Sequence, residues 1–223
     1  VALTTDEYAL SILALLNTVE LTIKDVETVA ICSVVPKLTR AFAHLAKKYF
    51  LRDPFIITSR ATLGIQINYD DPVLLGCDRI CNAVAAKEMF GSPVMIADFG
   101  TATTVDYITN ENCFAGGVIA PGVGICAEAL HERTSLLPKV DMCKPLLVLG
   151  QSTREGMSSG VFYGYIGLVD GLIERIYEHI HFKPPVIGCG GFSTLIASES
   201  KYIEKVVPDL TLHGVRLISK LNS

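Results

Sequence analysis

Two apolar, β-branched runs meet at one tight bend in the segment Ile-Ala-Asp-Phe-Gly-Thr-Ala-Thr-Thr-Val-Asp, residues 96–106. Asp98 ends the first run, and Gly100 tolerates backbone angles that a side chain resists, so the segment predicts a strand, a turn and a returning strand. The three threonines of the segment are Thr101, Thr103 and Thr104. Two interpretations of them stay open. Their hydroxyl and N–H groups are suited to binding a phosphate, or the threonines are simply the good strand formers of a hairpin.

The rest of the chain alternates helix-like and strand-like segments, which predicts an α/β fold. We expect helices near residues 4–16, 38–50, 78–90, 125–133, 153–180 and 210–221. We expect strands near residues 26–35 and 55–58, a strand that ends at residue 98, and a returning strand that runs through residue 108. Two further strands are expected at the starts of segments 116–124 and 186–191, and a loop is expected over residues 62–75. Gly160, Gly164 and Gly167 lie on one face of the longest helix, which suits close packing against another helix.

Composition and charge exclude several classes of protein. Half of the 223 residues are hydrophobic, but charged residues interrupt every apolar run, and none approaches the roughly 18 residues needed to span a bilayer. The net charge of -4 argues against a nucleic-acid partner, which requires a basic face. The seven cysteines form no CxxC pair and predict reduced thiols in a cytoplasmic protein. We therefore expect a small-molecule partner, with no nucleic acid and no membrane.

The segment Gly91-Ser92-Pro93 offers the clearest place to divide the chain, because a helix stops there and a strand begins. We expect an N-terminal lobe over residues 1–91 and a C-terminal lobe over residues 92–223. The closing helix, residues 210–221, is a candidate to pack back on the first lobe.

A second candidate site is the segment Gly76-Cys77-Asp78-Arg79 at the start of the expected 78–90 helix. The dipole and free N–H groups of a helix start favour an anionic guest, a carboxylate there is able to accept a hydroxyl proton, and an arginine binds a carboxylate with two hydrogen bonds. The alternative is an ordinary N-cap aspartate beside a surface arginine.

A third candidate is the glycine turn Gly188-Cys189-Gly190-Gly191, which follows a strand. Its bare backbone is suited to lie against a nucleotide base or ribose, or it merely connects two elements. The turn lacks the third glycine of a dinucleotide fingerprint, and the chain contains no GxxxxGK[ST] loop, so P-loop kinases are excluded.

Three motifs in this order, followed by the late glycine turn at residues 188–191, resemble the type III pantothenate kinase family. They are Gly-Cys-Asp-Arg-Ile-Cys-Asn at residues 76–82, Asp-Phe-Gly-Thr-Ala-Thr-Thr-Val-Asp at residues 98–106, and Gly-Gly-Val-Ile-Ala-Pro-Gly at residues 116–122. The resemblance covers nearly the whole chain. It implies two RNase H-like lobes of the actin, sugar kinase and Hsp70 superfamily. It also implies ATP-dependent phosphorylation of pantothenate to 4'-phosphopantothenate, the first step of coenzyme A biosynthesis.

The same resemblance implies a role for each matching residue. Asp78 is the general base that deprotonates the pantothenate hydroxyl. Pantothenate is bound by Tyr69, Gly76, Cys77, Asp78 and Arg79, and by Thr153 from the neighbouring subunit of a homodimer. ATP is bound with Mg²⁺ by Gly100, Thr101, Thr103, Gly190 and Gly191, and Asp98 is a ligand of a monovalent cation, K⁺ or NH₄⁺.

Two departures from the family pattern bear on these expectations. The family begins with a strand and an Asp-x-Gly-Asn-Thr turn, its first phosphate loop, and nothing in this sequence matches it. We expect that the first lobe is truncated at its N-terminus; the alternative is a non-catalytic regulatory homologue, similar to accessory transcription factors. A different small-molecule kinase on the same fold is a third hypothesis. The second departure is Ser152, where the family usually has asparagine before the threonine.

Overall fold

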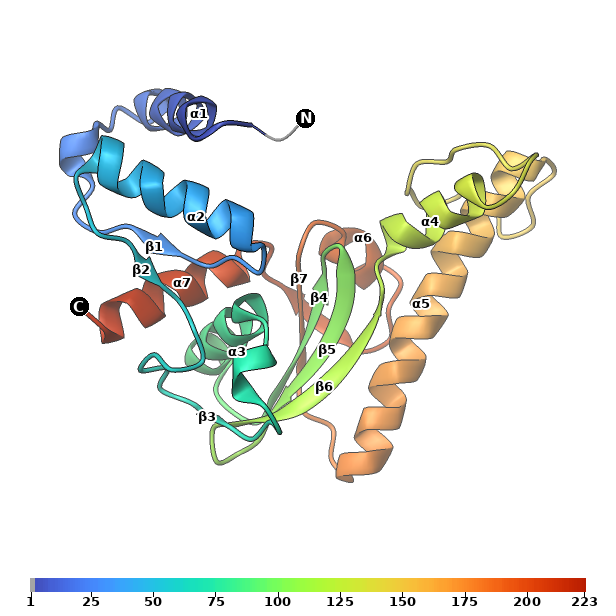
Figure 1. The fold of residues 1–223 in the computed structure, drawn as a ribbon. Helices are drawn as coiled ribbons and strands as arrows, with labels where there is room; N and C mark the ends of the chain where they lie inside the picture. The colour runs from blue at the N-terminus through green and yellow to red at the C-terminus, as the bar shows by residue number, and fades with distance from the viewer. Residues whose placement is uncertain (1–2) are drawn as a thin grey trace. The chain divides into compact units, whose positions relative to one another are not determined.

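A computed structural model describes residues 3–223, and the chain forms two compact units (Figure 1). Unit 1 comprises Val1–Gly64, Asp70–Val84 and Thr211–Ser223, and unit 2 comprises Ile65–Tyr69 and Ala85–Leu210. The division therefore falls within helix α3 (Cys77–Phe90), which begins in unit 1. Mixed helices and strands confirm the predicted α/β class.

Unit 1 combines helices with a small parallel sheet. Its sheet pairs β1 (Ala30–Ile31) with β2 (Phe55–Ile56). Its helical elements are α1 (Thr5–Thr18), η1 (Ile23–Asp25), α2 (Pro36–Leu45), η2 (Ala46–Phe50), η3 (Pro72–Leu74), the first part of α3 and α7 (Leu210–Leu221). Helix α7 approaches α3 so closely that a Cβ atom at Gly214 would collide with the backbone of Cys81. Thr211 Oγ1 also donates a hydrogen bond of 2.7 Å to Asn82 Oδ1.

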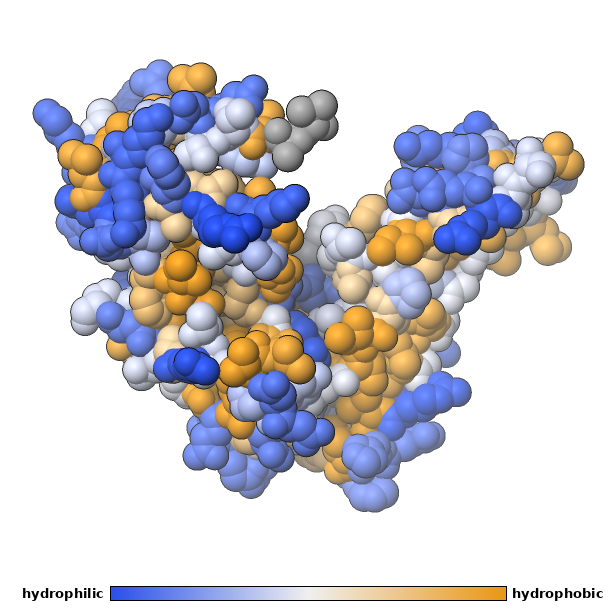
Figure 2. Space-filling model, in the orientation of Figure 1, coloured by the Kyte–Doolittle hydropathy of each residue, from blue (hydrophilic) through white to orange (hydrophobic). Residues whose placement is uncertain are grey.

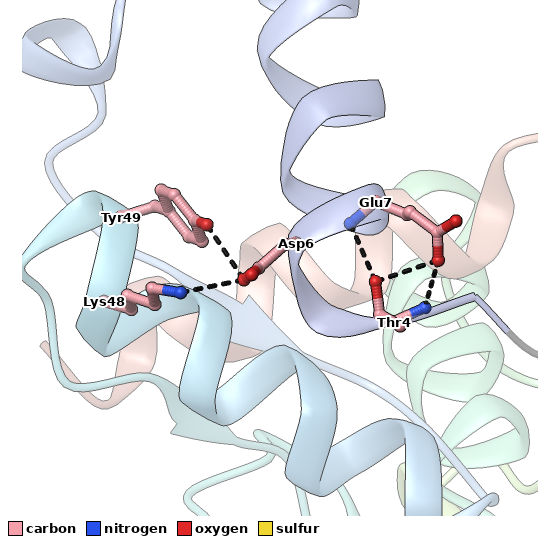
Figure 3. Close-up of polar contacts among 5 residues, drawn as sticks. All are labelled: Thr4, Asp6, Glu7, Lys48 and Tyr49. Carbon is pink, nitrogen blue, oxygen red and sulfur yellow. Dashed lines mark hydrogen bonds and ion pairs between the residues drawn. The ribbon is translucent and has the colours of Figure 1, made fainter.

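The first helix begins where the sequence predicts, at a complete capping box (Figure 3). The Thr4 hydroxyl accepts a hydrogen bond from the Glu7 N–H group at 3.3 Å, and Thr4 N donates to Glu7 Oε2 at 2.7 Å. In the same first turn, the Asp6 carboxylate accepts hydrogen bonds of 2.9 Å from Lys48 Nζ and from the Tyr49 hydroxyl. The hydrogen bond from Lys48 lowers the pKa of Asp6 below its ordinary value, with a further contribution from Tyr49. These contacts fasten α1 to η2.

Three expected elements of the N-terminal half differ from the structure. The expected strand at 26–35 is reduced to β1, because its partner β2 offers only two residues of ladder and Pro36 cannot donate a hydrogen bond. The expected helix at 38–50 changes after Leu45 into the π-helical turn η2 and stops at Leu51, whose φ is 54°. The expected loop at 62–75 contains η3 and the short strand β3 (Gln66–Ile67).

Unit 2 is built on a six-stranded sheet with the order β3-β6-β5-β4-β7-β8. Its other strands are β4 (Val94–Phe99), β5 (Ala102–Ile108), β6 (Cys113–Pro121), β7 (Val186–Cys189) and β8 (Ile203–Val206). The expected strand, turn and returning strand are confirmed as the antiparallel pair β4 and β5, in which Asp98 lies opposite Thr104. The parallel neighbour of β4 is β7, and Asp98 there lies opposite Cys189. The strand β8 has no counterpart among the expected elements.

The core of unit 2 lies between this sheet and two helices, α4 (Val123–Glu132) and α5 (Thr153–Ile180). Alternate residues of β4 face them, as the period of a strand requires: Met95, Ala97 and Phe99 are all buried in the same cluster as Phe162 of α5. Phe162 is fully buried, a contribution of roughly 1.5–3 kcal/mol for a side chain of this size. A short helix, α6 (Ser193–Ala197), follows β7. From residue 3 to residue 223 no helix combines the length and apolar character required to cross a membrane.

Candidate active site

The first group of predicted site residues lies at the start of α3 in unit 1. Asp78 Oδ1 accepts a hydrogen bond of 2.8 Å from the backbone N–H of Arg79. The Asp78 carboxylate is partly exposed, whereas Arg79 is buried at 7% exposure. A Cβ atom at Gly76 would collide with Asp78 Oδ1 and would lie 3.6 Å from Val34 Cγ1. The glycine therefore leaves the carboxylate the space that it occupies.

A cavity of about 830 Å³ lies beside this helix start, within unit 1. Three chain segments line it: residues 33–36 after β1, residues 56–60 at the end of β2, and residues 73–77 before Asp78. The cavity thus opens at the carboxyl ends of two parallel strands, which is where α/β folds bind ligands. Its wall contains apolar side chains with a few polar groups, among them Ser33, Thr58 and Arg60, a composition typical of small-molecule sites.

The second group lies in unit 2 at the turn between β4 and β5. Gly100 N donates a hydrogen bond of 3.2 Å to Ala102 O and closes the turn. Gly100 and Thr101 are exposed, and their carbonyl oxygens lie against Gly122, where an added Cβ atom would collide with Thr101 O and would lie 2.7 Å from Gly100 O. The Pro-Gly end of β6 therefore supports the turn from behind. Gly122 closes the motif at residues 116–122, but no local signal in the sequence indicates this supporting role.

Asp98, the predicted cation ligand, and the predicted adenosine turn at Gly190 meet at the carboxyl ends of the neighbouring parallel strands β4 and β7. Gly190 has a φ of 85°, and a Cβ atom there would lie 2.5 Å from Asp98 Oδ1 and 2.8 Å from the carbonyl carbon and oxygen of Phe99. Gly191 has open space around its α-carbon. Burial, and then the neighbouring Asp98 carboxylate, raise the pKa of the Cys189 thiol above its ordinary value. The partly exposed Asp98 is thus enclosed by glycine backbone and an uncharged thiol.

The three threonines of the turn have different environments. Thr101 is exposed at the bend, whereas Thr103 and Thr104 are buried in β5. The Thr103 hydroxyl contacts the hydroxyl of Tyr165 on α5, which also donates a hydrogen bond of 3.3 Å to Pro121 O. Burial raises the pKa of Tyr165. Tyr165 therefore links β5, β6 and α5 behind the turn, a connection for which the sequence carries no local signal.

The remaining predicted residues lie elsewhere in unit 2. Tyr69 follows β3, is 36% exposed, and meets the ring of Phe114 edge-on at 6.1 Å between centroids. Thr153 is the exposed first residue of α5. Ser152 precedes it as the helix N-cap and accepts a hydrogen bond of 3.3 Å from Glu155 N. The serine found in place of the family's asparagine therefore caps this helix.

The turn of unit 2 has the features of a phosphate cradle. Gly100, Thr101, Gly190 and Gly191 offer exposed or bare backbone and one hydroxyl, and the close approaches at Gly122 and Gly190 hold that backbone in place. Asp98 adds a carboxylate, an oxygen ligand of the kind that hard cations such as Mg²⁺ prefer. In unit 1, the Asp78 carboxylate is suited to accept a proton. The groups of the turn in unit 2, taken by themselves, are suited to the phosphates of a nucleoside triphosphate and to a cation.

Comparison with known proteins gives consistent matches. A family model described as type III pantothenate kinase matches residues 1–175. A type III pantothenate kinase from Halalkalibacterium halodurans is 43% identical over 219 residues, which cover 98% of this chain and 86% of that protein. A second type III pantothenate kinase, from Geobacillus sp. strain WCH70, is also 43% identical over 219 residues, which cover 98% of this chain and 85% of that protein.

Among solved structures, a Campylobacter jejuni protein assigned to the Baf family of transcriptional activators shares the fold. Its TM-score is 0.59 at 20% sequence identity, and the match covers 90% of this chain and 86% of that chain.

Proposed function

Because the chain belongs to the type III pantothenate kinase family, we propose that it transfers the γ-phosphoryl group of ATP to the hydroxyl of pantothenate and forms 4'-phosphopantothenate, the first step of coenzyme A biosynthesis. The family belongs to the actin and sugar kinase superfamily of ATPases. The observation that carries the proposal for this chain is the Asp78 carboxylate, which follows directly on two residues lining the 830 Å³ cavity and has its space reserved by Gly76.

In this proposal the residues of unit 1 bind pantothenate and hold the proton. The pantothenate hydroxyl donates its proton to Asp78 as its oxygen attacks phosphorus. Arg79 binds the acceptor together with Gly76 and Cys77. Tyr69 and, from the neighbouring subunit of a homodimer, Thr153 add contacts, although both residues belong to unit 2. Phosphoryl transfer asks mainly for positioning and charge neutralisation, so one correctly placed base is sufficient.

The residues of unit 2 receive the phosphates of ATP. Backbone N–H groups of Gly100 and Thr101 and the Thr101 hydroxyl bind phosphate oxygens, and Gly190 and Gly191 lie on the adenosine side. Thr103 acts through Tyr165, since its own hydroxyl is buried. Asp98 binds a monovalent cation, K⁺ or NH₄⁺. When bound together with ATP, Mg²⁺ would neutralise part of the negative charge of the triphosphate.

We further propose a homodimer that uses α5. Gly156, Gly160, Gly164 and Gly167 form one face of this helix, and apart from the adjoining backbone of α5 itself no atom lies within 4 Å of the position of a Cβ atom at any of them. Beside them lies an apolar groove of about 560 Å³ between α4 and α5, which includes Cys126, Leu130 and Leu168. The expected close partner of this face is thus not a helix within the described residues. A small-residue face with an apolar groove is suited to a second copy of α5, which would bring Thr153 to the neighbouring site.

All seven cysteines are free thiols, which supports a cytoplasmic location within the same proposal.

The test is an ADP-release assay on the protein expressed from its own gene. We expect pantothenate-dependent turnover, and we expect Asp78→Asn to lower kcat by at least about 100-fold with an unchanged circular dichroism spectrum. The matched control is Asp53→Asn, an exposed carboxylate that pairs with Lys47 on the surface of unit 1. If Asp78→Asn turned over as fast as the wild type, the assignment of Asp78 as the general base would be wrong.

Binding of pantothenate and ATP without ADP release would instead favour the regulatory homologue. Turnover with another hydroxy acid but not with pantothenate would favour a different small-molecule kinase.

A further inference from the structure

Three cysteine thiols converge where β1 meets the start of α3, inside unit 1. Cys32 directly follows β1, Cys77 is the first residue of α3, and Cys81 lies one helical turn later on the same face. Cys32 Sγ donates a hydrogen bond to Cys77 Sγ across 3.2 Å, although the two residues are 45 positions apart in the chain. No step of the proposed phosphoryl transfer uses the sulfur atom of Cys32.

Small molecules have a route to this pair of thiols. Cys77 lines the cavity of about 830 Å³ described above, and so does Ser33, the neighbour of Cys32 in the chain. Cys77 is 8% exposed and Cys32 is partly exposed. A molecule of the size of hydrogen peroxide is much smaller than this cavity and therefore reaches Cys77 without unfolding of unit 1.

Two other uses of the thiols fit the structure less well. Within residues 3–223 no group of three or more His, Cys, Asp or Glu side chains is arranged to hold a metal ion. The hydrogen bond with Cys32, followed by burial, raises the pKa of Cys77 above its ordinary value, so a resident thiolate nucleophile is not favoured at neutral pH. A paired arrangement of neutral thiols in contact is instead the starting geometry for a disulfide.

We propose that Cys32 and Cys77 form a reversible disulfide when the protein meets a peroxide, and that this bond inhibits the protein by moving the start of α3. The Cys77 sulfur attacks one peroxide oxygen and loses its thiol proton as the O–O bond breaks; Cys77 becomes a sulfenic acid, and the other oxygen leaves with that proton as water. Cys32 then attacks the Cys77 sulfur, the S–O bond breaks, and a second water leaves with the thiol proton. Two thiols and one hydrogen peroxide thus give one disulfide and two waters.

The bond changes the geometry next to Asp78. A disulfide holds its sulfurs about 2.05 Å apart, so the two sulfur atoms must approach each other from their present 3.2 Å. Cys77 is the residue between Gly76 and Asp78, and Gly76 approaches the Asp78 carboxylate so closely that an added Cβ atom would collide with it. A shift of Cys77 therefore displaces the carboxylate. The inhibitory part of the inference rests on the proposed function, whereas formation of the disulfide does not.

The test is peptide mapping of protein treated for hours with excess hydrogen peroxide, since neutral thiols oxidise slowly. Trypsin separates the three thiols, because Cys32, Cys77 and Cys81 fall on the peptides 25–37, 61–79 and 80–87. We expect a peptide pair linking 25–37 to 61–79, lighter by two hydrogens than the reduced peptides together, with equal loss of both free thiols. Dithiothreitol should reverse both effects.

Variants distinguish this bond from general oxidation. Cys32→Ser should lose the linked peptides, whereas Cys143→Ser, which removes an exposed thiol, should retain them. Free Cys32 after treatment, stable sulfinic acid at Cys77, or a link from Cys32 to Cys81 would each overturn the proposal. Peroxide should lower turnover reversibly in the wild type and not in Cys32→Ser; a disulfide without loss of turnover would overturn the inhibitory part. A protein inactive even when reduced would count against the kinase function alone, because the mapping result is independent of activity.

Discussion

The α-carbon of Gly190 lies so close to the carboxylate of Asp98 that an added Cβ atom would stand 2.5 Å from Asp98 Oδ1. The contact joins the end of β7 to the end of β4, which are parallel neighbours in the sheet. It therefore ties the proposed cation ligand to the proposed adenosine turn. A change at Gly190 is expected to act on both.

Gly190→Ala should destabilise the protein by about 1–3 kcal/mol, because alanine resists a φ of 85° and its Cβ atom would displace Asp98 or Phe99. Urea unfolding measures the loss. Gly191→Ala is the matched control, since its α-carbon faces open space, and its free energy of unfolding should stay near that of the wild type. Equal loss in both variants would show that the contact with Asp98 is not the cause.

Gly122→Ala should weaken ATP binding with little change in pantothenate binding. Its Cβ atom would push on the carbonyl oxygens of Gly100 and Thr101 and shift the turn that we propose binds phosphate. Isothermal calorimetry with a non-hydrolysable ATP analogue measures the effect, which we expect to reach about tenfold or more in Kd. Gly124→Ala, two residues along, meets no atom within 4 Å and serves as the control. Normal nucleotide affinity in Gly122→Ala would contradict the cradle.

Gly164→Leu should convert a dimer into monomers, because leucine fills the small-residue face of α5 beside the groove with Leu130. Figure 2 shows apolar surface where α5 lies near β6. A second pocket there is lined by Val118 of β6 and Ile176 of α5, so the row of glycines is only one part of the apolar surface on this helix. Sedimentation velocity gives the mass of the assembly.

The control for the dimer test is Glu178→Leu, which adds the same side chain at an exposed position on α5 outside the groove. A wild-type protein that sediments as a monomer, or a Gly164→Leu variant that stays dimeric, would reject α5 as the interface.

Ionisation of the Tyr177 hydroxyl at alkaline pH should lower the free energy of unfolding of the protein. Its buried hydroxyl donates a hydrogen bond of 3.0 Å to Pro184 O, and burial, with a smaller effect from Glu204, raises the pKa of Tyr177 from 10.0 to about 12. Because the folded-state pKa is the higher one, the contribution to stability is complete below pH 10 and is lost as the pH rises toward about 12.

Tyr177→Phe should therefore lose less of its free energy of unfolding than the wild type between these two pH values. Unfolding by urea at several pH values provides the comparison. If the free energy of unfolding changed with pH by the same amount in both proteins, the pKa of Tyr177 would not differ between the folded and unfolded states.

Local patterns in the sequence were sufficient for the helix that carries Asp78 and for the bend after Asp98. The helix expected at residues 78–90 matches α3, and the helix expected from residue 4 begins at the N-cap Thr4. Such signals lie within one or two helical turns of the residue that they place. The same reasoning overestimated the strand at 26–35, because strand length depends on a partner that a single segment does not reveal.

The contacts that define the candidate site were decided by the tertiary structure. Asp98 meets Gly190 only because β4 and β7 pair in parallel, and Cys32 meets Cys77 only because β1 ends beside the start of α3. The amino-acid sequence by itself determined which residues carry hydroxyl, carboxylate and thiol groups, and which backbone positions lack a side chain. Pairing across the sheet decided which of those groups touch, since hydrogen-bond register and close packing act between segments that are remote in the chain.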